Sequence, residues 1–372
     1  MRIAQISPLD ECVPPLRYGG TERVVHYLTE ELVRRGHEVV LFASGDSTTS
    51  AELYPCVPQA LRQAGYEGDR SVPALIQLDC VAEQRHRFDV LHFHTGHGHY
   101  PLTARLDVPH LTTMHGPLSA PSMTALHHHF ARVPLVSISE SQRLPLPLAH
   151  WLGTIHHGLP TDLYRFEPTP SPYLAFVGRI SPEKRLDRAI AIAAAAGLPL
   201  KVAAKVDAVD RAYFHAVIEP LLEGHPEVEF IGEVDDAGKQ ELLGHALALL
   251  FPIDWPEPFG LVMIEANACG TPVIAWCNGS TPEVIVDGLN GRLVQSIEQA
   301  VAAVRSIDQL PRTLIRADFE RRFCVERQAI AYEALYRRLI EAQGDPPAPS
   351  PAQAEQPLSP EGTALAQVCH AA

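Results

Sequence analysis

The sequence has no long hydrophobic run and very few lysines. No stretch reaches the roughly 18 apolar residues of a membrane-spanning helix, so we expect no integral membrane segment. Residues 1–7 read as a short buried strand and lack the features of a signal peptide, which predicts a cytoplasmic protein. The seven cysteines are scattered singly without a Cys-x-x-Cys pair, which argues against a disulfide framework.

Basic residues are outnumbered throughout the chain. The 30 basic and 44 acidic residues give a formal net charge of −14, which makes a nucleic-acid partner unfavourable. Residues 1–163 hold 12 arginines, no lysine and 16 acids, so this half offers no polybasic face to anionic lipid. The lysines, at positions 184, 201, 205 and 239, are so scarce that the position of Lys184 is informative.

The length of 372 residues suggests two domains at roughly 150 residues each. Short apolar runs alternate with amphipathic helical stretches, the pattern of doubly wound α/β domains with parallel sheets. We predict one domain over 1–165, a second over 166–322, a C-terminal helix over 323–343 that packs back on the first, and a disordered Pro/Ala-rich tail over 344–372. The predicted strands are 2–7, 38–43, 88–94, 110–115, 134–138 and 153–157, then 173–178, 200–205, 227–231, 246–252, 272–276 and 291–294.

Cations follow the first predicted strand of the second domain. The strand ends at Gly178, and Ser181 with Pro182 is typical of the beginning of a helix. Lys184 then falls in the first turn and Arg179 just before it, where the helix dipole disfavours positive charge. A bound diphosphate would satisfy these cations, and ion pairs with nearby acids are the alternative.

A second motif, residues 255–272 (WPEPFGLVMIEANACGTP), leads from an apolar strand through a tight turn into a helix. Gly260 at the start of the helix would let backbone amides approach a ligand without a Cβ in the way. Glu257 precedes the helix and Glu265 lies within it. Carboxylates suit hydroxyl-rich ligands because they accept O–H hydrogen bonds, although Glu265 taken alone fits an exposed helix surface better.

A third motif, Gly19-Gly20, lies between the first strand and the first helix, where backbone amides can face phosphate or sugar oxygens. Together with Gly178-Arg179-(x)4-Lys184 and Glu257-(x)7-Glu265, it resembles the retaining glycosyltransferases of family 4 (glycosyl transferases group 1). The order and spacing match from about residue 1 to about residue 340.

The resemblance implies a GT-B fold, in which two Rossmann-like doubly wound domains face a cleft. It implies a retaining hexosyltransferase (EC 2.4 class) that moves a sugar from a nucleotide-sugar donor to an acceptor hydroxyl. A UDP-sugar is the expected donor, with GDP- and ADP-sugars as alternatives, and no further cofactor or metal is expected. The acceptor stays open among glycans, small molecules and lipid-linked molecules.

The resemblance also implies residue roles. Arg179 and Lys184 would bind the donor diphosphate and stabilise the leaving group in place of a metal ion, and Gly19 and Gly20 would close on the donor from the first domain.

On the sugar side, the resemblance implies that Glu257 faces the transferred sugar, either as a nucleophile or only to position it. Glu265 would hold the donor ribose, and His115 matches a position where the family often has a histidine near the sugar. The backbone amides that would contact sugar and phosphate are those of Phe259, Gly260 and Leu261.

Two other hypotheses stay open. Closely spaced histidines at 92, 94, 97 and 99 are also typical of metal-dependent hydrolases, although no matching acidic ligands follow. A non-catalytic nucleotide-sugar binder would carry the same motifs. The chain also departs from the family, with His156-His157-Gly158 where Asn-Gly is frequent and Lys205-Val206-Asp207 where a glycine-rich turn is frequent.

Overall fold

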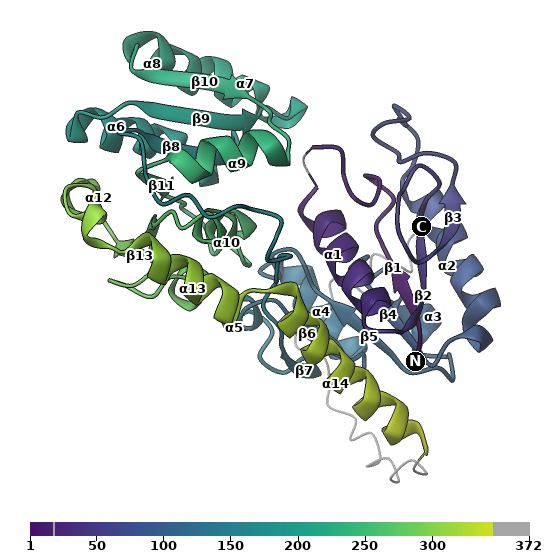
Figure 1. Cartoon of the computed structure of the whole chain (residues 1–372). Coiled ribbons are helices and arrows are strands. Elements are labelled where there is room, and N and C mark those ends of the chain that lie inside the picture. Colours follow the sequence, from purple (N-terminus) through teal and green to yellow (C-terminus); the bar gives the residue numbers. More distant parts are fainter. Residues whose placement is uncertain (18, 345–372) are drawn as a thin grey trace.

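The computed structural model describes residues 1–17 and 19–344 (Figure 1). The chain forms two α/β domains, each built on one sheet of parallel strands, and the sheets hold seven and six strands. The predicted fold class is therefore confirmed. The predicted disordered tail, 344–372, lies outside the described residues apart from Gly344.

Strands and helices alternate through the first domain. They follow one another as β1 (Arg2–Ile6), α1 (Gly20–Arg34), β2 (Glu38–Ser44), β3 (Glu52–Val57), α2 (Ser71–Gln84), β4 (Val90–Phe93), α3 (Tyr100–Thr103), β5 (His110–Thr113), α4 (Pro121–His129), β6 (Leu135–Ser137), α5 (Glu140–Arg143) and β7 (Trp151–Thr154).

The second domain repeats this alternation. Its elements are β8 (Leu174–Arg179), α6 (Leu186–Ala196), β9 (Leu200–Lys205), α7 (Arg211–Tyr213), α8 (Glu219–Gly224), β10 (Val228–Gly232), α9 (Asp236–His245), β11 (Ala248–Phe251), α10 (Leu261–Ala268), β12 (Val273–Trp276), α11 (Thr281–Val284), β13 (Gly291–Val294), α12 (Ile297–Val304) and α13 (Arg312–Arg322). The chain then returns to the first domain as α14 (Val325–Gly344), which Figure 1 shows running along that domain.

Both sheets reverse their strand order beside their first strand. The first sheet has the order β3-β2-β1-β4-β5-β6-β7, and the second has the order β10-β9-β8-β11-β12-β13. The reversal opens a crevice at the carboxyl ends of β1 and β4 in one sheet and of β8 and β11 in the other. The glycine pair follows β1, the cations follow β8 and the Glu257 segment follows β11, so all three motifs lie at these switch points.

The strand prediction misses one element. All twelve predicted strands are present within a few residues, but β3 (Glu52–Val57) was not among them. This strand pairs only with β2 at the edge of the sheet and contains Pro55. Proline lacks a backbone N–H donor and is tolerated in strands at the edge of a sheet. Because proline usually argues against a strand, a sequence pattern that contains it does not predict one.

Helices cover both faces of the first sheet. Leu28 and Leu32 of α1 pack with Tyr332 and Tyr336 of α14 over one face, where Ile3 lies beneath them. On the other face a second cluster joins the sheet to Val81 of α2. Within the described part of the chain, no helix is long and apolar enough to cross a membrane.

The two domains share one hydrophobic cluster. Tyr27 of α1 and Ile138 of the first domain pack with Phe251 and Phe259 of the second. The two chain segments that cross between the domains lie side by side, because the amide of Leu159 donates to the carbonyl of Phe323 at 2.9 Å. The domains therefore meet at a packed junction.

Candidate active site

A cavity of about 730 Å³ lies between the domains, where the two switch points face each other. Its lining includes every residue predicted for the site, namely Gly19, Gly20, His115, Arg179, Lys184, Glu257, Phe259, Gly260, Leu261 and Glu265. Residues far apart in the sequence therefore meet in one space.

The two predicted phosphate-binding cations are paired with acids in this structure. Lys184 Nζ contacts the Glu257 carboxylate and lies 5.1 Å from the centre of the Trp255 ring. The Arg179 guanidinium contacts Glu183 at 2.7 Å and Asp210 at 3.4 Å. The predicted ion pairs are therefore present, and the same cations line the cavity, so diphosphate binding stays a prediction.

The predicted helix start at Ser181 is wrong in detail. Residues 182–184 form a short 3₁₀ turn, Arg185 adopts a left-handed conformation with φ 55°, and α6 begins only at Leu186. The Arg185 guanidinium holds this break by pairing with Asp187 at 2.8 Å and Asp254 at 2.8 Å. Lys184 is therefore placed by a turn and not by the first turn of α6.

The turn between Glu257 and α10 is as tight as Gly260 leads us to expect. Gly260 has φ 79°, and a Cβ there would lie 2.9 Å from Met263 Cε and 3.0 Å from Phe251 Cζ. The Glu257 side chain is buried, and Trp255 Nε1 donates to its Oε2 at 2.9 Å. The first turn of α10 can thus present its amides to the cavity while Glu257 is held in a single position.

Glu265 is not an exposed helix acid. It is only 4% exposed, and its Oε1 lies 2.7 Å from Lys239 Nζ. Lys239 also lines the cavity and was not predicted as a site residue, although the scarcity of lysines is a signal that could have pointed to it. The buried pair places a carboxylate and an ammonium group together on the second-domain wall.

His115 is held as a neutral hydrogen-bonding group. Burial lowers its pKa to about 3. Gln5 Oε1 lies 2.8 Å from His94 Nε2, so that nitrogen carries the proton, and His94 Nδ1 then accepts from His115 Nε2 at 2.8 Å. The other ring nitrogen of His115, Nδ1, therefore carries no proton and can accept a hydrogen bond.

The other histidines of the 92–99 cluster have structural partners. His92 lies 2.7 Å from the Tyr336 hydroxyl and 2.7 Å from the Thr113 hydroxyl. His99 lies 2.9 Å from the Thr112 hydroxyl. Across residues 1–17 and 19–344, no group of three or more His, Cys, Asp or Glu side chains could hold a metal ion, so the hydrolase hypothesis gains no support from this cluster.

Glu22 is a cavity residue that the motifs did not single out. It lies in the first turn of α1, two residues after the glycine pair, and is 6% exposed. The pKa of this carboxyl is raised to about 7, chiefly by burial and in part by the charges of Asp10 and Glu11, against the lowering effects of a backbone hydrogen bond and of Arg62. A carboxyl that can stay protonated near neutral pH adds no full negative charge to the cavity.

We expect Glu22→Gln to stabilise the protein at high pH. The folded state keeps a proton on Glu22 up to a pH of about 7, whereas the unfolded chain releases it near 4.5, so wild-type stability falls as pH rises between these values. The gain in unfolding free energy of the variant should be larger at pH 8 than at pH 5 by ~2 kcal/mol. Chemical denaturation at both pH values measures it, with exposed Glu67→Gln as control, and an equal gain at both would contradict the assignment.

Two parallel-sheet domains face a cleft, with cations at one switch point and a glycine pair at the other, which is the arrangement expected of the GT-B class. Residues 165–317 match the family model described as glycosyl transferases group 1, and residues 18–196 match that of glycosyltransferase family 4. The chain belongs to glycosyltransferase family 4 (glycosyl transferases group 1), and it is a glycosyltransferase.

Known relatives support the assignment over most of the chain. The D-inositol 3-phosphate glycosyltransferase of Mycolicibacterium smegmatis is 27% identical over 357 residues, which cover 81% of this chain and 82% of that protein. The glycogen synthase of Mycobacterium tuberculosis is 27% identical over 353 residues, which cover 79% and 83%.

Solved structures share the fold. Sucrose-phosphate synthase from Thermosynechococcus elongatus superposes with a TM-score of 0.76 at 21% identity, covering 92% of this chain and all of that one. Anabaena HepE, solved in complex with UDP and glucose, has a TM-score of 0.70 at 19% identity, covering 91% of this chain and 100% of that one.

Proposed function

We propose that this glycosyltransferase moves a sugar from a UDP-sugar to an acceptor hydroxyl with retention of the anomeric configuration. The observation that carries the proposal is the cavity itself, which joins Arg179, Lys184 and Glu265 of the second domain to His115 of the first. HepE, which shares the fold, has been solved with UDP-glucose, and we therefore take uridine as the first base to test.

The donor diphosphate would lie beside Arg179, Lys184 and the amides at the start of α10. Glu257 and Glu183 balance these cations, and the phosphates would take over part of that pairing. The ribose hydroxyls would donate to Glu265, whose position is kept by Lys239. Protonated Glu22 would limit repulsion between the first-domain wall and the donor.

Transfer would break the bond between the anomeric carbon and the diphosphate oxygen, and the electron pair would leave with the phosphate. The acceptor oxygen would attack the same face of the sugar, and its proton would pass to the departing phosphate oxygen. Arg179 and Lys184 would stabilise the charge that develops there. Because these cations serve the leaving group, we expect transfer to continue in excess EDTA.

We assign Glu257 a positioning role and not that of a nucleophile. Its Oε2 contacts Lys184 and accepts from Trp255 Nε1. These contacts fix the direction of the carboxylate, and the same-face attack needs no covalent intermediate, so we assign Glu257 the positioning of the sugar. His115, with Nδ1 as its acceptor, would bind a sugar hydroxyl from the opposite wall.

A donor panel tests the proposal. Purified protein is incubated with UDP-, GDP- and ADP-sugars, and release of the nucleotide is followed with and without candidate acceptors. We expect release from a UDP-sugar, and nuclear magnetic resonance of the glycoside should show the anomeric configuration of the donor. Inverted product would overturn retention, and binding of a donor without release would support the non-catalytic binder. Neither release nor binding with any donor would overturn the proposal.

A further inference from the structure

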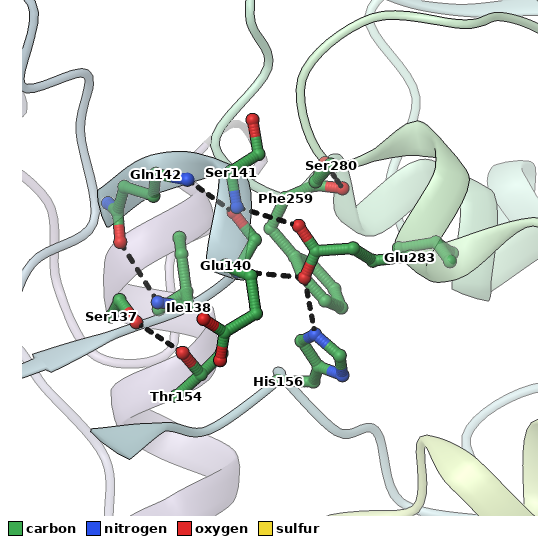
Figure 2. Close-up of polar contacts among 12 residues, drawn as sticks. Ser137, Ile138, Glu140, Ser141, Gln142, Thr154, His156, Phe259, Ser280 and Glu283 are labelled. Atoms are coloured by element: carbon green, nitrogen blue, oxygen red, sulfur yellow. Dashed lines mark hydrogen bonds and ion pairs between the residues drawn. The ribbon is translucent and has the colours of Figure 1, made fainter. Parts of the chain in front are cut away.

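One carboxylate of the second domain ties together three segments at the junction of the domains (Figure 2). Glu283, in α11, accepts from the backbone amides of Glu140 and Ser141 at 2.8 Å each. Its Oε2 also lies 3.1 Å from His156 Nε2. Both amides belong to the first turn of α5 in the first domain, and His156 lies just before the crossing to the second.

The Glu283 carboxylate is held in its ionised form. Burial raises the pKa of this group, but the hydrogen bonds from His156, Ser141 and Glu140 outweigh burial, and the net pKa lies below the ordinary value. Two amides at the start of a helix lack partners within that helix, so a carboxylate is well suited to bind them. This contact between the domains is therefore a charged one.

On the first-domain side, α5 is connected to His115. Gln142 of α5 donates from Nε2 to the carbonyl of Met114 at 2.8 Å and to that of Gly116 at 2.9 Å. These carbonyls flank His115 in the chain. A shift of α5 would therefore move the backbone that carries the His115 ring.

The second-domain side is connected to the donor loop. Ser280, which precedes α11, donates from Oγ to the carbonyl of Phe259 at 2.9 Å and from its amide to the carbonyl of Glu257 at 3.0 Å. Gly279 approaches the same loop so closely that a Cβ would lie 2.3 Å from the Glu257 amide. The segment that carries Glu283 is therefore packed on the Glu257 loop.

The histidine pair before the crossing lies between the two sides. The His157 ring stacks on His115, with centroids 5.3 Å apart, and meets the Phe259 ring edge-on at 4.9 Å. His156, the residue before His157 in the chain, contacts the Glu283 carboxylate. The departure from the family at residues 156–158 thus has a structural role in this chain.

We propose that Glu283 is a positioning residue for sugar transfer, because its contact with α5 and His156 fixes His115 of the first domain opposite the Glu257 loop of the second. The proposal rests on the proposed function for its catalytic part. Glu283 does not line the cavity, so it acts through its neighbours and not on the substrate. Small displacements of reacting groups can cost up to about a hundredfold in rate.

Two variants test the proposal. Glu283→Gln keeps the length of the side chain but loses the charge and one acceptor oxygen, and Glu283→Ala removes the contact. Glu298→Gln is the matched control, since Glu298 is an exposed acid in the first turn of α12 of the same domain. Thermal unfolding first identifies a temperature at which all four proteins are folded.

We expect Glu283→Gln to lower kcat about tenfold, and Glu283→Ala more, while UDP affinity stays within about twofold of wild type. Such a split between kcat and binding is not expected from general loosening of the donor domain. Unchanged kcat in both variants, or equal losses of kcat and UDP affinity, would overturn the positioning role.

Amide hydrogen exchange separates this proposal from the proposed function. The amides of Glu140 and Ser141 should exchange at least tenfold faster in Glu283→Ala than in wild type or the control, whether or not a donor is turned over. Unchanged exchange would disprove the contact itself. If the contact is confirmed but wild-type protein transfers no sugar, the proposed function fails, and the positioning role in catalysis fails with it.

Discussion

Lys184→Ala should lower kcat/KM for the donor by about two to three orders of magnitude, which is the range seen when one group that stabilises developing negative charge is removed. The lysine lies in the cavity and contacts Glu257. Under the proposed function its loss would remove positive charge beside the leaving group and would also release the Glu257 carboxylate that we place beside the sugar. Steady-state kinetics with the best donor of the panel measures the effect.

Lys201→Ala is the matched control for this prediction. Lys201 lies on β9 of the same domain, its side chain is 38% exposed, and it is not part of the cavity. Its variant should keep wild-type kcat/KM. If Lys184→Ala were as active as Lys201→Ala, Lys184 would have no role in transfer, and its ion pair with Glu257 would be purely structural.

Glu265→Ala should weaken UDP binding and also destabilise the protein, by ~3 kcal/mol. The stability loss arises because Lys239 would keep its buried charge without its main partner, although Asp236 remains 3.1 Å away. The affinity loss arises because the ribose would lose its carboxylate acceptor. Urea denaturation and calorimetric titration with UDP measure the two effects separately.

Glu265→Gln distinguishes the two causes. The amide keeps an acceptor oxygen for Lys239 and fills the same space, so its cost in stability should be clearly smaller than that of alanine. UDP binding should still weaken, because a neutral amide accepts less strongly from ribose hydroxyls than a carboxylate. Full UDP affinity in both variants would exclude Glu265 from the donor site.

The cavity-lining residues of the three motifs could be predicted from the sequence because each motif is local. The glycine pair, the Arg179–Lys184 spacing and the Glu257–Glu265 spacing each lie within one strand–turn–helix unit, where short-range patterns are informative. The parallel sheets then bring the carboxyl ends of these strands together. Fold class and cavity lining could therefore be anticipated from residues that are neighbours in the chain.

The features that were missed depend on contacts far along the chain. Lys239 is held in the cavity by pairing with Glu265, 26 residues further along the chain, and the pKa of Glu22 is raised by its burial and by the charges of Asp10 and Glu11. Glu283 meets α5 across more than a hundred residues of sequence. Local sequence patterns do not show these contacts, because they form only when distant segments fold together.

The most direct test of the central claim is a calorimetric titration of UDP into wild-type protein and Arg179→Ala. The account predicts that wild type binds UDP with a 1:1 stoichiometry and that the variant, still folded, binds at least tenfold more weakly, a loss of about 1.4 kcal/mol. Equal affinity in both proteins would contradict the placement of the diphosphate at Arg179. The absence of UDP binding by wild type would contradict the proposed donor.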